Sequence, residues 1–163
     1  MKTIKLLLGN SEVRFGNLIE TLVRKGCADQ AILECTRVAE SGDLAQKGCE
    51  GAFDLIIAVP EKVRPDRRPQ GTLGPFGETV RAISAIKAQR TTPVIALLSK
   101  EQEQAALIEA GADYVVGVPF NCEELKALVR QVLALTQPAA GAVPTRWSFA
   151  EALIRGFHRL TQS

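Results

Sequence analysis

The stretch from Thr92 to Val129 limits the fold of this chain more than any other, because short apolar runs alternate in it with amphipathic ones. Residues 93–98 (PVIALL) and 114–118 (YVVGV) are continuous apolar runs, as in strands that are buried on both faces. Between them, the spacing predicts a helix over 101–110 that ends at Gly111, since glycine commonly follows the last residue of a helix. Alternating strands and helices predict a parallel sheet.

The helix after the second of these strands has the clearest start signal. Asn121 precedes it and Glu124 follows three residues later, which is the capping-box pattern that satisfies free N–H groups of the first turn. The residues that then form one apolar face are Leu125, Leu128, Val129, Val132 and Leu133. We expect this face to pack on the sheet.

The first half of the chain repeats the alternation. We expect strands at residues 4–8, 31–38 and 53–59, and helices at about 14–25, 43–49 and 78–89. Short connections then require a five-stranded parallel sheet with right-handed crossovers and helices on both faces. Prolines and arginines between Val59 and Gly77 suit neither a helix nor a central strand, so we expect a long loop there.

Composition is that of an ordinary globular protein. The chain has 163 residues, enough for one domain with a short appendage, and its apolar runs fall short of the about 18 residues of a membrane span. We expect a domain over residues 1–135, a Pro/Ala/Gly linker over 136–146 and an amphipathic helix over 147–163. A net charge of +2 is too small to indicate a nucleic-acid partner.

The four cysteines, at positions 27, 35, 49 and 122, show no Cys-x-x-Cys spacing, and the single histidine, His158, is distant in sequence. We therefore expect no metal, no cofactor and no redox dithiol, and thiols that are reduced and mostly buried. The start of the chain has no signal-peptide pattern, so we expect a cytoplasmic protein.

Three local motifs carry a resemblance to a known family. They are TPVIAL at 92–97, the EAGAD turn at 109–113, and VPF at 118–120 followed by an acidic helix start. With them, residues 1–135 resemble a response-regulator receiver domain. The resemblance implies a flavodoxin-like fold with strand order 2-1-3-4-5 and a cleft at the carboxyl ends of the strands.

The resemblance also implies a chemistry that this chain departs from. Receivers hold Mg²⁺ with an acidic pair after the first strand, accept a phosphoryl group on an aspartate that ends the third strand, and bind that group with a Ser/Thr and a lysine. The five corresponding positions here are Asn10, Ser11, Val59, Leu98 and Val118. We therefore expect a degenerate pseudo-receiver that is not an enzyme, is not phosphorylated in the usual way and acts in signalling by binding another protein.

The long loop leaves a second interpretation open. Its cationic residues are Lys62, Arg64, Arg67 and Arg68, which suit an acidic protein or a phosphate-bearing ligand, although a solvated insertion explains them as well. In the alternative function, the chain is a small-molecule-binding or enzymatic domain of the same fold. Its cleft binds a small molecule or an anion, Asn10, Ser11 and Ser99 supply polar contacts, and the arginine-rich loop closes over the anion.

The expected C-terminal helix has an apolar stripe that must be buried somewhere. The stripe consists of Trp147, Phe149, Leu153, Ile154, Phe157 and Leu160. It would pack on its own domain, mediate a homodimer or bind a protein partner. We expect no membrane span and no nucleic acid among its partners.

Overall fold

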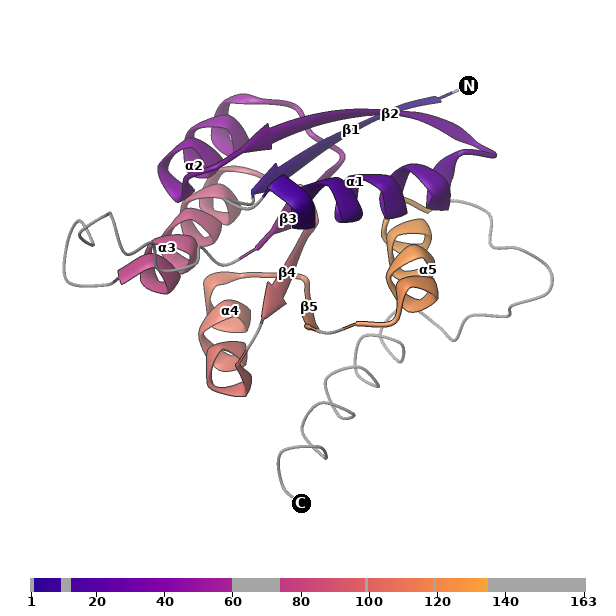
Figure 1. Cartoon of the computed structure of the whole chain (residues 1–163). Helices are drawn as coiled ribbons and strands as arrows, with labels where there is room; N and C mark the ends of the chain where they lie inside the picture. Colours follow the sequence, from indigo (N-terminus) through magenta and orange to yellow (C-terminus); the bar gives the residue numbers. More distant parts are fainter. Residues whose placement is uncertain (1, 10–12, 60–73, 99, 119, 135–163) are drawn as a thin grey trace, which may run out of the picture.

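The computed structural model describes residues 2–9, 13–59, 74–98, 100–118 and 120–134. They form a five-stranded parallel sheet in the order β2-β1-β3-β4-β5, as predicted (Figure 1). The strands are β1 (Lys2–Gly9), β2 (Ala31–Val38), β3 (Leu55–Ala58), β4 (Val94–Leu98) and β5 (Tyr114–Gly117). The helices are α1 (Val13–Cys27), α2 (Ser41–Glu50), α3 (Gly74–Gln89), α4 (Gln104–Ala110) and α5 (Cys122–Val132), with a 3-10 turn, η1 (Glu101–Glu103), directly before α4.

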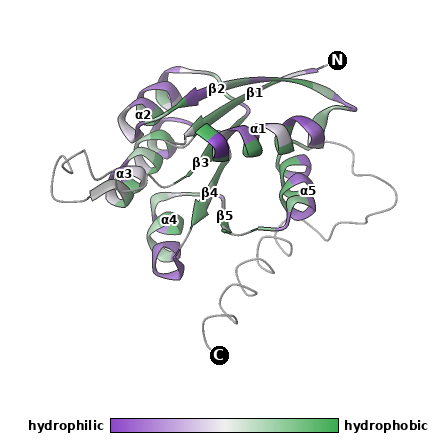
Figure 2. Ribbon diagram, viewed as in Figure 1, coloured by the Kyte–Doolittle hydropathy of each residue, from purple (hydrophilic) through white to green (hydrophobic). Residues whose placement is uncertain are grey.

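Helices cover both faces of the sheet. One core cluster joins α1 and α5 to residues such as Leu6, Ile57 and Val116, and a second joins α2, α3 and α4 to their alternate neighbours, such as Leu7 and Ile56. Every residue of β3 and β4 is buried, because both faces of these strands are covered. Figure 2 shows the central strands as hydrophobic and the outward sides of the helices as hydrophilic.

Two predicted helix boundaries are confirmed by their local geometry. Gly111 follows α4 with a φ of 108°, a backbone conformation that residues with a Cβ rarely adopt. Its N–H donates a hydrogen bond to Ile108 O. The Asn121 side chain accepts hydrogen bonds from the N–H groups of Glu123 and Glu124 at the start of α5.

Other boundaries differ from the prediction. The strand expected at 53–59 is shorter and covers only Leu55–Ala58. Before β3 begins, Asp54 bonds to Lys5 through both its side chain and its backbone. Helix α3 begins at Gly74 rather than at residue 78, so the expected loop ends four residues earlier. Pro75 is compatible with this start, since proline lacks a backbone N–H and the first turn of a helix does not need one.

Most of the expected loop and all of the expected linker and C-terminal helix lie outside the part of the chain that the structure describes. The cationic loop residues at 62, 64, 67 and 68, the linker at 136–146 and the helix at 147–163 all lie outside the described residues. Within the described ranges, no helix combines the length and the apolar character needed to cross a membrane.

Candidate functional site

The strands of a parallel sheet all end at the same edge, and this carboxyl edge is where the resemblance places a phosphorylation site. The backbone N–H of Val59 donates to Gly9 O at 2.9 Å, so Val59 lies beside the end of β1. In the same way, the N–H of Val118 donates to Leu98 O at 2.8 Å, so Val118 lies beside the end of β4. Three of the five predicted positions, Val59, Leu98 and Val118, therefore lie along this edge.

Their side chains do not all turn to the same side of the sheet. Val59 and Val118 are half-buried and pack against the core cluster on the face of α1 and α5. Leu98 is buried in the cluster on the face of α2, α3 and α4. All three side chains are hydrocarbon, so none of them supplies a nucleophile, a metal ligand or a charge for a phosphoryl group.

Two phenylalanines extend this apolar edge, and the sequence did not predict that they meet. Phe15 near the start of α1 and Phe120 after β5 have ring centroids 6.2 Å apart. Both pack against the same cluster as Val59 and Val118. Phe120 belongs to the VPF motif, but its neighbour Phe15 comes from a segment more than a hundred residues away in sequence, and only the fold brings them together.

The aspartate that precedes the acceptor position in sequence serves another purpose. Asp54 lies before β3, at the amino end of the strand, while Val59 follows its carboxyl end. Its Oδ2 accepts a hydrogen bond from Lys5 N at 2.9 Å, and its own N–H donates to Lys5 O at 2.9 Å. Asp54 therefore joins β1 to β3 at the opposite edge and cannot replace the missing acceptor.

Other predicted site residues lie outside the described residues. These are Asn10, Ser11 and Ser99 in the cleft, the four cationic residues of the loop, and the apolar stripe from Trp147 to Leu160. Across the described ranges, no three His, Cys, Asp or Glu side chains form a group that could hold a metal ion.

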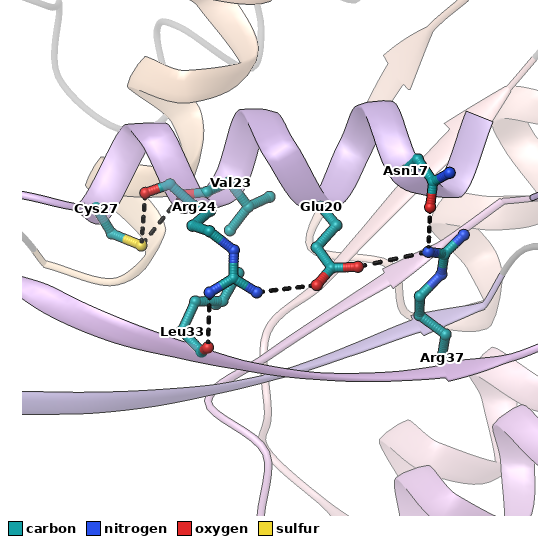
Figure 3. Close-up of polar contacts among 7 residues, drawn as sticks. All are labelled: Asn17, Glu20, Val23, Arg24, Cys27, Leu33 and Arg37. Carbon is teal, nitrogen blue, oxygen red and sulfur yellow. Dashed lines mark hydrogen bonds and ion pairs between the residues drawn. The ribbon is translucent and has the colours of Figure 1, made fainter. Parts of the chain in front are cut away.

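A polar network between α1 and β2 is a feature that the sequence did not predict (Figure 3). Arg37 on β2 donates to Asn17 Oδ1 and to Val13 O on α1, and its guanidinium lies 3.5 Å from Glu20 Oε2. A side chain at Gly16 would collide with this guanidinium, since an added Cβ would lie 2.3 Å from it. Glycine in the first turn of α1 therefore leaves room for the Arg37 guanidinium against the helix.

The thiols near this network are poor nucleophiles. Burial raises the pKa of Cys35 to about 11 and also raises the pKa of Cys27, which donates a hydrogen bond to Val23 O. Both remain protonated at neutral pH. The expectation of mostly buried thiols was wrong, because only Cys27 is buried, Cys35 and Cys49 are half-buried and Cys122 is exposed.

Comparisons with known proteins bear on the fold. No protein-family model matches the sequence, and no curated protein matches it either. Among solved structures, the receiver domain of a sensor histidine kinase from Pseudomonas aeruginosa, which has magnesium in its active-site cleft, has 19% identity and a TM-score of 0.61 over 81% of this chain and 98% of its own.

Two further receiver domains are similar to the same extent. One from a Francisella response regulator has 17% identity and a TM-score of 0.59, and covers 80% of this chain and 97% of its own. One from Methanospirillum hungatei has 15% identity and a TM-score of 0.60, and covers 82% of this chain and 95% of its own. At such identities the likeness shows the fold alone: this chain has the flavodoxin-like fold of response-regulator receiver domains.

Proposed function

We propose that this chain is a receiver-like signalling domain that is not phosphorylated on an aspartate and acts, without catalysis, by binding another protein in the cytoplasm. The observation that carries the proposal is that three hydrocarbon side chains lie along the carboxyl edge of the sheet. Val59, Leu98 and Val118 occupy the positions where the receiver pattern has an aspartate, a Ser/Thr and a lysine.

Physical chemistry argues against phosphorylation at such an edge. A phosphoryl group brings a charge near −2, and a charge next to an apolar cluster is costly unless cations or hydrogen-bond donors surround it. Val59 and Val118 instead pack with Phe15 and Phe120 against a hydrophobic cluster. Their packing favours one arrangement of the edge, where a working receiver alternates between two.

The surface for the partner is part of the proposal. The loop with Lys62, Arg64, Arg67 and Arg68 suits an acidic protein, because guanidinium groups form bidentate bonds with carboxylates. The apolar stripe from Trp147 to Leu160 supplies a second contact, either to the partner or to another copy of this chain.

Phosphorylation is tested directly by intact-mass spectrometry of the full chain after incubation with acetyl phosphate and Mg²⁺. We expect no gain in mass, while a receiver domain with a complete acidic pocket gains one phosphoryl group under the same conditions. An Asp54→Asn variant controls for labelling at the other end of β3. One phosphoryl group mapped to any aspartate of the wild-type chain would refute the proposal.

The partner is tested by comparing two forms of the chain in cells. The wild-type chain and a variant with all four loop cations changed to alanine are cross-linked and recovered under the same conditions. We expect one partner protein to be recovered with the wild-type chain in a one-to-one ratio. The amount of that protein recovered with the variant should be at least tenfold lower. Equal recovery with both forms would exclude the loop as the contact.

A further inference from the structure

Strand β2 is an edge of the sheet, and the hydrogen bonds of β1 show which of its backbone groups face outward. Lys5 and Gly9 bond to residues of β3, so the odd-numbered residues of β1 turn their backbone groups toward β3 and the even-numbered ones toward β2. In a parallel pair, a residue that turns its backbone groups toward the neighbouring strand bonds to the two residues on either side of its partner, and the partner turns its own groups away. Ile4 turns toward β2 and pairs with Leu33, so Leu33 turns outward. The outward N–H and C=O groups are therefore those of Ala31, Leu33, Cys35 and Arg37.

One contact supports this assignment. Leu33 O accepts a hydrogen bond from the Arg24 guanidinium of α1 at 3.2 Å (Figure 3). A carbonyl that faced β1 would accept a backbone N–H of that strand instead. Arg24 thus covers part of the edge. Its side chain is 52% exposed, so the contact is weak and easily given up.

The face of β1 and β2 that is opposite α1 is also uncovered at its amino half. Helix α2 lies only over the carboxyl half, where Leu44 packs against Gly9. The exposed residues on this face are Thr3 and Lys5 of β1 and Ile32, Glu34 and Thr36 of β2. Ile32 is the large apolar residue among them, and 55% of its surface is exposed.

We propose that β2 pairs antiparallel with β2 of a second copy of this chain, so that one sheet runs through a dimer. A two-fold axis perpendicular to the sheet keeps both α1 helices on one face and places like-facing residues opposite each other. It passes midway between the two β2 strands, so that one residue of β2 lies opposite its own copy. Of the central residues, Glu34 is excluded as that residue, because two carboxylates would then lie directly opposite each other.

An axis between the two copies of Cys35 gives the best match. Ile32 then lies opposite Val38 of the second copy, which joins two apolar side chains, and Glu34 lies opposite Thr36. Cys35 lies opposite its own copy, as a hydrogen-bonded pair. A shift of the axis to Thr36 leaves Ile32 beyond the paired region. This self-complementarity is the reason for choosing a second copy of the chain as the occupant of the edge.

The same register satisfies the outward backbone groups. Leu33 and Arg37 face each other across the axis, and such pairs exchange two N–H···O bonds. Leu33 O then accepts from the backbone of the second copy, and the guanidinium of Arg24 is released. Arg24 therefore limits the association, in the way that charged side chains protect the edges of natural sheets.

Association is measured by analytical ultracentrifugation of the full chain from micromolar to millimolar concentration. We expect a reversible dimer that Ile32→Lys weakens at least tenfold and that Arg24→Ala strengthens. The matched control is Ile108→Lys, since Ile108 on α4 is similarly exposed but lies near the other edge of the sheet. Circular dichroism checks that each variant is folded.

The register is tested by oxidation of an Ile32→Cys/Val38→Cys variant, whose positions form a close pair in the proposed dimer. A 32-to-38 link between chains, identified by mass spectrometry, supports the register. A chain that stays monomeric at every concentration would overturn the proposal, and so would a dimer that Ile108→Lys weakens and Ile32→Lys does not.

Discussion

Gly111 shows how a single residue sets the course of the chain between α4 and β5. Its φ of 108° is unfavourable for any residue with a Cβ, and an added Cβ would lie 3.1 Å from the side chain of Lys87. The sequence position alone, directly after an amphipathic segment, was enough to predict this role. Local backbone geometry is readable from sequence because it depends on few neighbours.

We expect Gly111→Ala to lower the free energy of unfolding by about 1–2 kcal/mol, the cost of a left-handed conformation for an L-residue. The control is Gly42→Ala in α2, where nothing lies within 4 Å of an added Cβ. That change should be neutral or stabilise the fold by up to about 1 kcal/mol, because alanine favours helices. Urea unfolding of the two variants compares them, and equal effects would contradict this account.

At the scale of elements, the packing of α2 on α3 depends on a glycine whose role is not apparent from sequence. An added Cβ at Gly48 would lie 2.5 Å from Cδ1 of Ile86, which is fully buried. The two helices also share a buried hydrogen bond between Ser41 and Thr79. Close approach of two helices is a property of their pairing, so neither helix shows it by itself.

We expect Gly48→Ala to destabilise the protein by about 1 kcal/mol, because overpacking outweighs the gain in helix propensity. Ile86→Val removes Cδ1, the nearer of the two clashing carbons, at a cost of about 0.5–1.5 kcal/mol, and leaves Cγ1, which lies 2.7 Å from the added Cβ. The double variant should be more stable than the sum of the single effects predicts. Strict additivity in denaturant unfolding would show that the two residues are not coupled.

The boundaries of elements were harder to predict than their existence. Strand β2 spans the predicted residues, whereas β3 is shorter and α3 begins earlier than expected. The early start of α3 was missed because proline was taken as the end of helical structure, although the first turn of a helix accepts it.

At the scale of the whole molecule, one ion pair joins the turn after α1 to α5. Arg130 donates to Asp29 through both terminal nitrogens, at 2.8 and 3.2 Å, and also to Gly26 O. The hydrogen bonds from Arg130, and then that from Gln30, lower the pKa of Asp29 to about 2 from its usual 3.8. The periodicity of a sequence cannot predict that two residues a hundred positions apart form an ion pair.

This pair predicts a dependence of stability on pH. The ionised form of Asp29 is favoured in the folded state, so its contribution is complete above about pH 4 and is lost as the pH falls from 3.8 toward 2. We expect Asp29→Asn to be less stable than the wild type at pH 6 and equally stable below pH 2, as measured by urea unfolding. Glu34→Gln, on exposed β2, is the control. A difference for Asp29→Asn that persists below pH 2 would contradict the prediction.

The sequence by itself determined the fold class, the order of strands and helices along the chain, and the hydrocarbon character of Val59, Leu98 and Val118, three of the five positions that correspond to the phosphorylation site of a receiver. These depend on periodicity and on local motifs, which are properties of neighbouring residues. Only the tertiary structure decided that Val59 and Val118 pack with Phe15 and Phe120 on one face while Leu98 is buried on the other. The side to which a strand residue turns, and what it meets there, depend on how distant segments pair, so a pattern along the chain does not contain them.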